Sequence, residues 1–368
     1  MPPKKKGNSS KKGTTNSKDD DGPGKDPAAL LTSYKKICVT IGLPLSTNDP
    51  VILALKGGDG AAGETDNHGK QIVISAREGQ AEDALLGPGR CRALALAISG
   101  RGHGLPLTES GEPIAFTLAT DLRICRSRIG DDGTVAVADM LRLGATELNF
   151  LELMDCRIES RGAFALGRSL SCAANTTLTS LRLDHNTNLK SEGIAALCQG
   201  LCTNSTLKNL SVQYCTIDAE GAKSIAEMLS FPRSAITSLN LSGDQLGGQG
   251  IATLSSQGLS RNSSLVELLL ADNGIRSSVE DVSALKVFGE AVSAHPTLTT
   301  IDLLHNYIGD EGGRALLPSL QDNKRVHTIK IDPKSVLDET TYNALNRCSA
   351  SSAKGKKKKG GKGKKKTK

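Results

Sequence analysis

Tryptophan is absent from the sequence and the other aromatic residues are few, with four Tyr and five Phe among 368 residues. The core of the protein must therefore be aliphatic, and the chain lacks the aromatic platforms on which single-stranded nucleic acids stack. No apolar run approaches the roughly 20 residues that are needed to cross a bilayer, and we recognise no targeting peptide. We expect a soluble, intracellular protein.

Motifs of catalytic and metal sites are equally scarce. The chain has no His-Glu-x-x-His, no Gly-x-Ser-x-Gly and no Cys-x-x-Cys. Cys198 and Cys202 lie four residues apart on a predicted helix without a histidine in register, so we interpret them as core thiols. The Gly-rich stretch at 57–69 lacks the Gly-Lys-Ser/Thr of a phosphate-binding loop and predicts a flexible connection. We therefore expect no enzyme activity, no cofactor and no metal.

What the chain does contain is a repeated unit, represented by residues 207–229. Its apolar residues first follow a strand pattern at Leu210 and Val212 and then a helical period that ends at Leu229. The unit begins at Leu148, Leu178, Leu207, Ile236, Leu265, Leu298 and Val326, at steps of 28 to 33 residues. Because one short strand and one helix cannot bury their own apolar faces, this period predicts a solenoid of stacked units.

The units resemble the leucine-rich repeats of ribonuclease-inhibitor type, Leu-x-x-Leu-x-Leu-x-x-Asn/Cys-x-Ile with Gly four residues on. Three nearly complete copies are Leu148, Leu151, Leu153, Cys156, Ile158 with Gly162; Leu207, Leu210, Val212, Cys215, Ile217 with Gly221; and Leu298, Ile301, Leu303, Asn306, Ile308 with Gly312. The resemblance implies an α/β horseshoe with parallel strands on its concave face and helices on its convex face. It also implies that the Asn or Cys caps the turn after each strand; Asp244 and Ser127 depart from this pattern.

Composition divides the chain into four parts. We predict a disordered basic arm at 1–26, a helical cap and Gly-rich loop at 27–69, the leucine-rich repeat solenoid at 70–348 and a disordered Lys-rich tail at 349–368. The first units of the solenoid are expected to be irregular. One has a strand at Ile72 to Ile74, and Cys91, Leu94 and Leu96 match the strand template 28 residues before Ala119, Leu122 and Ile124. Residues 336–345 are expected to close the last core face.

The predicted cap contains two helices. Leu30, Tyr34 and Cys38 share one helical face, and Asn48 and Asp49 can cap a second, short helix. The run from Tyr34 through Cys38 and on to Leu55 also resembles the segment that leads into ribonuclease-inhibitor-type repeats in several centrosomal and ciliary proteins. This second resemblance implies a placement among single-solenoid adaptor proteins.

Alternate strand positions project onto the concave wall as two rows. The first row is Arg123, Glu152, Arg182, Ser211, Asn240, Leu269, Asp302 and Lys330, and the second is Cys125, Met154, Asp184, Gln213, Ser242, Ala271, Leu304 and Asp332. The rows mix positive and negative residues, which disfavours a nucleic-acid groove and favours a protein partner. We predict that Arg123, Glu152, Arg182, Asp184, Ser211, Gln213, Asn240, Leu269, Asp302 and Lys330 bind it. His185 and His305, at strand ends, are expected to be only solvated.

Positive charge is concentrated at the ends of the chain. Residues 354–368 hold ten Lys and no acidic residue, and residues 1–26 hold seven Lys and four Asp, so the net +7 of the chain leaves −6 for the part between them. We interpret Lys356, Lys357, Lys358, Lys359, Lys364, Lys365 and Lys366 as a tether for a polyanion such as acidic tubulin tails, nucleic acid or anionic lipid. A nuclear localisation signal and a merely solubilising tail are the alternatives.

These features lead to one functional hypothesis and two alternatives. The hypothesis is a non-enzymatic scaffold or adaptor in the cytoplasm, whose concave face binds a protein while the basic tails hold it on an acidic filament, such as a microtubule of the cytoskeleton or a cilium. The family it resembles also includes activators of the small GTPase Ran, so a regulator of a small GTPase is the first alternative. A nuclear, RNA-associated protein held by its Lys-rich tail is the second.

Overall fold

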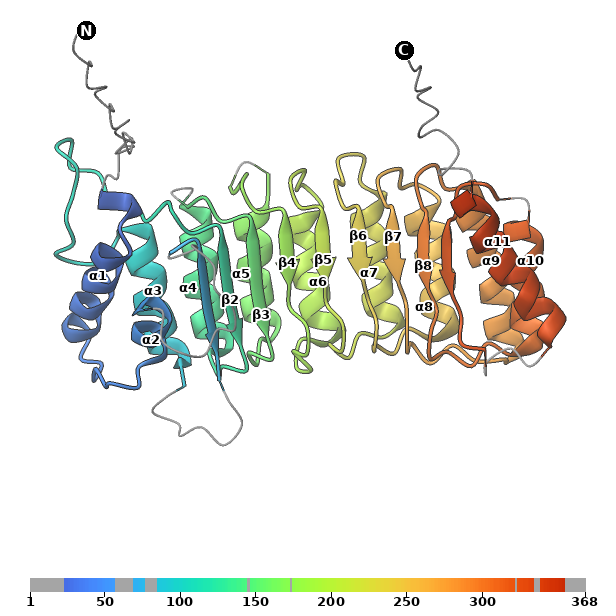
Figure 1. Ribbon diagram of the computed structural model, residues 1–368, viewed down its shortest axis with the longest axis horizontal. Helices are drawn as coiled ribbons and strands as arrows, with labels where there is room; N and C mark the ends of the chain where they lie inside the picture. The colour runs from blue at the N-terminus through green and yellow to red at the C-terminus, as the bar shows by residue number, and fades with distance from the viewer. Residues whose placement is uncertain are drawn as a thin grey trace, which may run out of the picture.

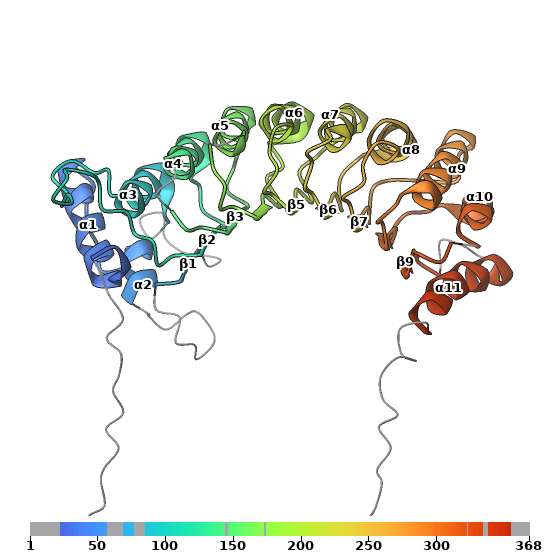
Figure 2. The same ribbon diagram turned by 90° about the horizontal axis from the view of Figure 1, so that it is seen from above.

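The chain forms a curved solenoid, with one sheet on the inner side and a row of helices on the outer side (Figures 1 and 2). The structure is a computed structural model that describes residues 23–56, 69–76, 85–143, 146–172, 174–321, 323–333 and 338–354. The strands of the sheet are parallel and follow their order in the chain from β1 to β9. The predicted horseshoe is confirmed.

The strands are three to five residues long. They are β1 Gln71–Ser75, β2 Asp121–Cys125, β3 Phe150–Met154, β4 Ser180–Arg182, β5 Asn209–Ser211, β6 Ser238–Asn240, β7 Glu267–Leu269, β8 Thr300–Asp302 and β9 Thr328–Lys330. Central leucines such as Leu181, Leu210 and Leu239 lie opposite one another in register and are buried. The repeat period of the sequence thus returns the same residue type to the same place in the core.

The helices alternate with the strands and pack side by side. They are η1 Pro23–Lys25, α1 Pro27–Thr40, α2 Pro50–Lys56, α3 Gly87–Ser99, α4 Gly130–Arg142, α5 Ser160–Leu170, α6 Lys190–Leu201, α7 Ala219–Ser230, α8 Gly247–Thr253, the π-helical η3 Leu254–Leu259, α9 Val279–Ala294, α10 Gly309–Gln321 and α11 Glu339–Lys354. The approach of α6 to α5 is so close that a Cβ at Gly200 would lie 1.9 Å from the carbonyl oxygen of Gly167. Glycine is therefore required at position 200.

Capping side chains of the turns after the strands are of two kinds. The Oδ1 atoms of Asn186, Asp244 and Asn306 each accept backbone N–H groups of the preceding repeat. In the repeats before Asn186 and Asp244, the Sγ atoms of Cys156 and Cys215 donate to backbone carbonyls at 3.2 Å, and burial raises the pKa of both thiols. The capping role implied by the resemblance is confirmed, and Asp244 keeps the acceptor geometry of the asparagines.

The first unit of the solenoid differs from our prediction. The predicted strand at Ile72 to Ile74 is present within β1, and Ile72 pairs directly with Leu122 of β2. Residues 91–96, where the template predicted another strand, lie within α3, so that part of the prediction is wrong. The template was misleading because Leu94 and Ile98, one helical turn apart, are both buried on the core side of α3.

One buried carboxylate joins the N-terminal cap to the solenoid. Asp49 Oδ1 accepts from the backbone N–H groups of Val51 and Ile52 at 3.0 and 3.1 Å, so it caps α2 as predicted. The hydroxyl of Tyr34 on α1 donates to Asp49 Oδ2 at 3.0 Å, and Arg90 Nε of α3 lies 3.1 Å from the same oxygen. Burial, and then the negative charge of Asp49, raise the pKa of Tyr34 far above its usual range. Three helices are thereby fixed by a single side chain.

Both predicted boundaries with the basic ends require correction. The carbonyl of Gly24 accepts from Thr117 N at 2.8 Å, so residues 23–26, assigned to the disordered arm, pack on the solenoid. Helix α11 continues to Lys354, beyond the predicted end of the solenoid at 348, because Leu345 anchors it to the core. Residues 338–345 close the last core face as expected, whereas Val336, also part of that prediction, lies outside the described residues. Residues 1–22 and 355–368, including all the proposed tether lysines, lie outside the described residues.

Candidate functional site

The concave wall carries the first predicted row of side chains in strand register. Arg123 lies opposite Glu152, Glu152 opposite Arg182, and Asp302 opposite Lys330. Ser211, Asn240 and Leu269 complete the row between them. The structure therefore brings together the eight residues that the repeat spacing predicted to be neighbours. Their role in binding stays a prediction.

Positive and negative charges on this wall lie at different depths. Arg182 Nη1 is 3.5 Å from Glu152 Oε1, and Lys330 Nζ is 2.9 Å from Asp302 Oδ2. The two basic side chains are 43% and 49% exposed, whereas the two acidic ones are only 10% and 11% exposed. The hydrogen bond to Asp302 raises the pKa of Lys330. The acids thus form the floor of the wall, and the basic groups project into the hollow of the arc.

Asp184, which we predicted to contact a partner, is almost completely buried. Its Oδ1 accepts from the Ser211 hydroxyl at 2.6 Å, and its Oδ2 accepts from Gln213 Nε2 at 3.0 Å. The other end of Gln213, Oε1, accepts from Asn240 Nδ2 at 3.2 Å. Four predicted site residues therefore form one network in which Asp184 orients the side chains above it rather than facing the hollow. Since Ser211 is also buried, Gln213 and Asn240 are the members that a partner can reach.

An aromatic ledge follows the strands at the centre of the arc, formed by His185 and Tyr214. In β2 to β8, the residue four positions after the central Leu or Ile of the strand has a left-handed backbone; these residues are Arg126, Asp155, His185, Tyr214, Gly243, Asp272 and His305. The rings of His185 and Tyr214 stack with centroids 4.9 Å apart, and Tyr214 remains 41% exposed. Our prediction that His185 is only solvated is therefore wrong. The recurring position could have indicated the contact, because equivalent residues of adjacent repeats are neighbours.

Gly243 supports this ledge, and its replacement tests the packing. A Cβ at Gly243 would lie 2.2 Å from the Tyr214 ring, on a backbone with φ of +74°. We expect Gly243→Ala to lower the free energy of unfolding by about 2 to 3 kcal/mol, the sum of backbone strain and overpacking. Gly274→Ala is the control, since Gly274 has φ of +69° but no atom within 4 Å of its Cβ position. Equal losses in urea denaturation would show that the Tyr214 contact contributes nothing.

A second ladder, which the sequence analysis missed, stabilises the turns before the strands. The Oδ1 atoms of Asn175, Asn204 and Asn262 accept the N–H groups two and three residues on, and their Nδ2 atoms donate to the preceding repeat. His295 takes this place one repeat later, where its Nδ1 accepts from Leu298 N at 3.1 Å. Its Nε2 is buried and has no partner in the described part of the chain. The recurring Asn-x-Ser/Thr-Leu could have revealed this ladder.

His295→Asn should reduce the sensitivity of the protein to acid. Burial, and then Arg325, lower the pKa of His295. In the unfolded chain, His295 takes up a proton near pH 6.5, whereas in the folded protein it stays neutral to lower pH. The free energy of unfolding therefore falls as the pH drops below about 6.5. We expect the free energy of unfolding of the variant to exceed that of the wild type by about 1 kcal/mol at pH 5.5, and the two proteins to differ less at pH 8. Thermal unfolding across this range measures the effect, with the exposed His305→Asn as control; an equal gain at both pH values would contradict the prediction.

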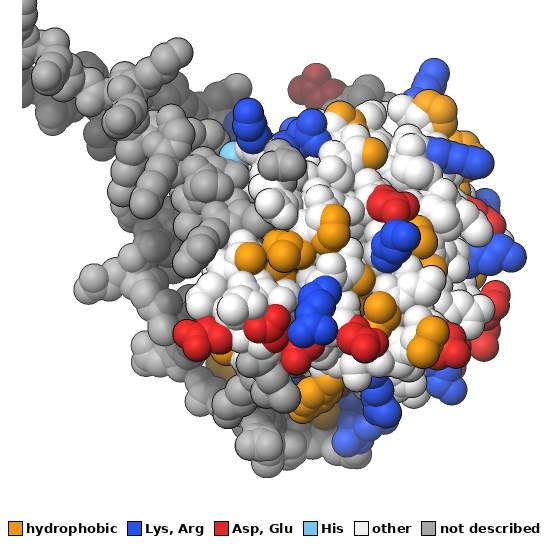
Figure 3. All heavy atoms as spheres, turned by 90° about the vertical axis from the view of Figure 1, so that its right-hand side faces the viewer, with side chains coloured by type: hydrophobic (Ala, Val, Ile, Leu, Met, Phe, Trp, Pro, Cys, Tyr) orange, Lys and Arg blue, Asp and Glu red, His pale blue; other side chains and the backbone are white. Residues whose placement is uncertain are grey.

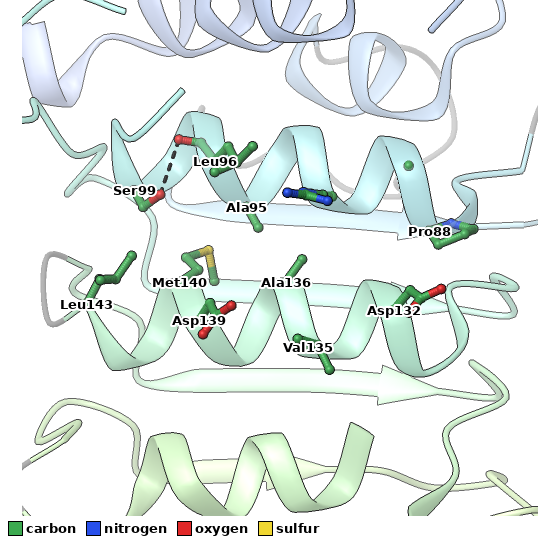
Figure 4. Close-up of a pocket in the computed structure, with 12 residues that line it drawn as sticks. Pro88, Ala95, Leu96, Ser99, Asp132, Val135, Ala136, Asp139, Met140 and Leu143 are labelled. Atoms are coloured by element: carbon green, nitrogen blue, oxygen red, sulfur yellow. Dashed lines mark hydrogen bonds between the residues drawn. The ribbon is translucent and has the colours of Figure 1, made fainter. Parts of the chain in front are cut away.

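The described residues offer little for catalysis or metal binding. They contain no group of three His, Cys, Asp or Glu side chains arranged to hold a metal ion. Cys198 is buried, with its pKa raised by burial, as expected for a core thiol. A groove of about 610 Å³ lies on the outer side between α3 and α4 (Figure 4). The acidic side chains that line it, Asp132 and Asp139, already pair with arginines, so we assign no ligand to it.

Comparison with known proteins supports the repeat assignment. A family model described as leucine rich repeat matches residues 174–198, 203–226 and 294–317. Mouse (Mus musculus) ribonuclease inhibitor is 28% identical over 202 residues, which are 55% of this chain and 42% of that protein. Human (Homo sapiens) NACHT, LRR and PYD domains-containing protein 5 is 28% identical over 207 residues, 56% of this chain and 16% of that one. The chain spans less than half the length of these relatives.

More distant similarities extend to a regulatory protein and to two solved structures. A protein phosphatase 1 regulatory subunit 37 homolog of Caenorhabditis elegans is 25% identical over 147 residues, 40% of this chain and 15% of that protein. The tropomodulin C-terminal domain of Caenorhabditis elegans covers 53% of this chain and 93% of its own, with 14% identity and a TM-score of 0.35. Actin-binding site 2 of leiomodin-1 covers 53% of this chain and 92% of its own, with 16% identity and a TM-score of 0.33. These two structures carry no functional argument.

Among the described residues, no helix is long and apolar enough to cross a membrane.

Proposed function

We propose that this chain, a leucine-rich repeat protein of the ribonuclease-inhibitor type, is a non-enzymatic adaptor whose concave wall binds a protein partner. The observation that carries the proposal is the register of the wall, which lines up half-exposed basic groups such as Arg182 and Lys330 over a floor of acids. The exposed Tyr214 stands at the same wall's margin. Tyrosine and arginine are the residues that most often dominate binding energy at protein interfaces.

The second half of the proposal concerns where the adaptor is held. The Lys-rich segment that contains Lys356–Lys359 and Lys364–Lys366 would tether the protein to an acidic filament surface, such as the tubulin of a cilium or of the cytoplasmic cytoskeleton. A weak tether raises the local concentration of the arc near its partner, so the two contacts together bind more strongly than either alone. A nuclear location, with the tail on nucleic acid, is the alternative.

A regulatory role is a second candidate function. It is favoured by the similarity to a protein named as a phosphatase 1 regulatory subunit homolog. The regulator of a small GTPase, suggested by the repeat type, belongs to the same class. In both cases the wall would bind an enzyme and change its rate, whereas an adaptor would leave the rate unchanged. Turnover by protein phosphatase 1 and by a panel of small GTPases, with and without the full-length protein, separates the two roles.

The wall is tested by capture of partners from cell extract. The wall variant combines Arg182→Ala, Gln213→Ala and Tyr214→Ala. The control variant replaces three exposed helix residues and combines Phe164→Ala, Lys223→Ala and Lys286→Ala. A partner that uses the concave wall should be retained by the wild type and by the control and be lost, at least tenfold, by the wall variant. If all three proteins retain the partner, the partner does not bind through the concave wall, and this part of the proposal is wrong.

The tether is tested by location in cells. The tagged full-length protein is compared with one that ends at Ala353. We expect the full-length protein on microtubules or cilia and the shortened one spread through the cytoplasm. A nuclear full-length protein that the truncation releases would contradict the filament proposal and favour nucleic acid.

A further inference from the structure

The edge of the solenoid at which the strands begin, named here the strand-start edge, is basic over its C-terminal half. It comprises the described connections before β5 to β9, residues 202–208, 231–237, 260–266, 295–299 and 323–327. Their charged side chains are Lys208, Arg233, Arg261, Lys324 and Arg325, all of them positive. The acidic residues next to them in the sequence are Glu267, the first residue of β7, whose Oε2 accepts from the Ser238 hydroxyl at 2.7 Å, and Asp322, whose placement is not described.

Four of these basic side chains are free to meet a ligand. Lys208, Arg233, Arg261 and Lys324 are exposed. None of them takes part in the ion pairs formed among the described residues. Arg325 differs, because it is partly buried and donates to the carbonyl of His295. The edge thus differs from the concave wall, where acidic neighbours neutralise the basic groups.

Helix dipoles do not account for these positive charges. The last turns of α6, α7, α9 and α10 contain no basic residue, and the four exposed side chains lie in the connections beyond them. Acidic residues, by contrast, do occupy the first turns of the same helices, as helix dipoles favour. The solenoid is therefore polarised across its width. Seen from its C-terminal end, most acidic side chains lie in the lower half, whereas Lys and Arg occur in both halves and reach the upper margin (Figure 3).

The strand-start edge is continuous with the Lys-rich end of the chain. Helix α11 ends at this edge with Lys354, and the sequence beyond it holds only Lys, Gly and Thr (Figure 1). Two exposed apolar side chains stand between the basic ones: Phe231 is 44% exposed and Val266 is 38% exposed. Bases of a nucleic acid could stack on Phe231, but the described connections of this edge contain no second Phe, Tyr or Trp to continue such stacking. A polypeptide can place carboxylates on the basic residues and aliphatic groups beside both Phe231 and Val266.

We propose that the strand-start edge from Lys208 to Lys324 is a docking site for a glutamate-rich polypeptide segment in extended conformation. Charge complementarity identifies this occupant, and the aliphatic Val266 beside the single ring of Phe231 favours a polypeptide over a nucleic acid. The inference rests on the proposed tethering to an acidic surface and deepens it, since the folded edge adds fixed, spaced contacts to the charge of the tail. It is independent of the partner on the concave wall.

The test compares two full-length variants with equal net charge. The edge variant combines Lys208→Glu, Arg233→Glu, Arg261→Glu and Lys324→Glu. The control combines Lys190→Glu, Lys223→Glu, Arg276→Glu and Lys286→Glu, all of them exposed residues outside this edge. The probe is a fluorescein-labelled polyglutamate peptide, followed by fluorescence anisotropy at low and at physiological salt. We expect the edge variant to bind about tenfold or more weakly than wild type, and the control to stay within about threefold.

The outcomes separate the edge from the tether. If the edge variant binds like wild type while a protein that ends at Ala353 does not bind, the tail alone recognises acidic peptides, and the edge assignment is wrong although the tether stands. If the wild type binds no polyglutamate, the tether itself fails. If polyuridylic acid binds more tightly than polyglutamate and loses affinity in the edge variant, the ligand is a nucleic acid, and the polypeptide assignment is overturned. Circular dichroism confirms that both variants are folded.

Discussion

Asn186→Ala is expected to lower the free energy of unfolding by about 4 kcal/mol, since it leaves three buried backbone groups without partners and a fourth, the Leu183 carbonyl, with only the Cys215 thiol as donor. Asn186 Oδ1 accepts from the N–H groups of Cys156 and Ile158 at 2.9 and 3.1 Å. Its Nδ2 donates to the carbonyls of Leu153 and Leu183 at 2.8 and 2.7 Å. One side chain therefore holds two adjacent repeats together, in a place that water does not reach.

Asn188→Ala is the matched control for this prediction. Asn188 lies in the same turn but is exposed, and its Nδ2 donates to Glu159 Oε1 at 3.1 Å. We expect its replacement to cost no more than about 0.5 kcal/mol. Urea denaturation followed by circular dichroism measures both variants, and hydrogen exchange shows whether the loss is confined to the repeats next to Asn186, as nearest-neighbour stability in a solenoid predicts. Similar losses for the two variants would contradict the role of the ladder.

Asp244→Asn is expected to stabilise the protein, by roughly 2 to 4 kcal/mol at pH 8. Asp244 stands in the same ladder, and its Oδ1 accepts from Cys215 N and Ile217 N at 2.9 and 3.1 Å. Its Oδ2 is buried and has no partner among the described residues, where an asparagine would supply the Nδ2 donor that Asn186 uses. The wild-type residue therefore keeps an unpaired carboxylate oxygen in a site built for an amide.

The gain from Asp244→Asn should depend on pH. Burial raises the pKa of Asp244 to about 7, although backbone hydrogen bonds oppose the shift. The unfolded carboxyl loses its proton near pH 4, while the folded one keeps it until about pH 7, so the stability of the wild type falls as the pH rises through this interval. The advantage of the variant should shrink by more than half between pH 8 and pH 5. A gain that is independent of pH would show that Asp244 is ionised in the folded protein throughout.

Asp244 and His295 are two capping residues whose effects on stability depend on pH in opposite directions, so together they narrow the pH range in which the protein is most stable. Asp244 lowers stability towards alkaline pH, and His295 lowers it towards acid pH. Both occupy places where other repeats have asparagine, a residue that does not titrate. The double variant Asp244→Asn, His295→Asn should therefore have a flatter dependence of stability on pH than the wild type, and the two effects should add, since the residues cap different turns.

Several features of the site were predictable because a solenoid repeats one geometry. Residues at equal positions in successive repeats become cross-strand neighbours, so the row from Arg123 to Lys330 could be written down from spacing alone. The same rule failed for residues 91–96, where a helix with small apolar residues matched the strand template. It also missed the stacking of His185 on Tyr214, because that contact depends on side-chain direction at a left-handed residue.

The sequence by itself determined the fold of this protein, since the repeat period fixes which residues are buried and which strands are adjacent. It also determined the charge of the two ends. Only the tertiary structure decided how charge is distributed in depth and across the width of the arc. Asp184 lies beneath Gln213, Arg182 stands above Glu152, and basic residues of separate repeats lie along one edge. Burial and the relative heights of side chains depend on all the neighbouring repeats together, and no single repeat encodes them.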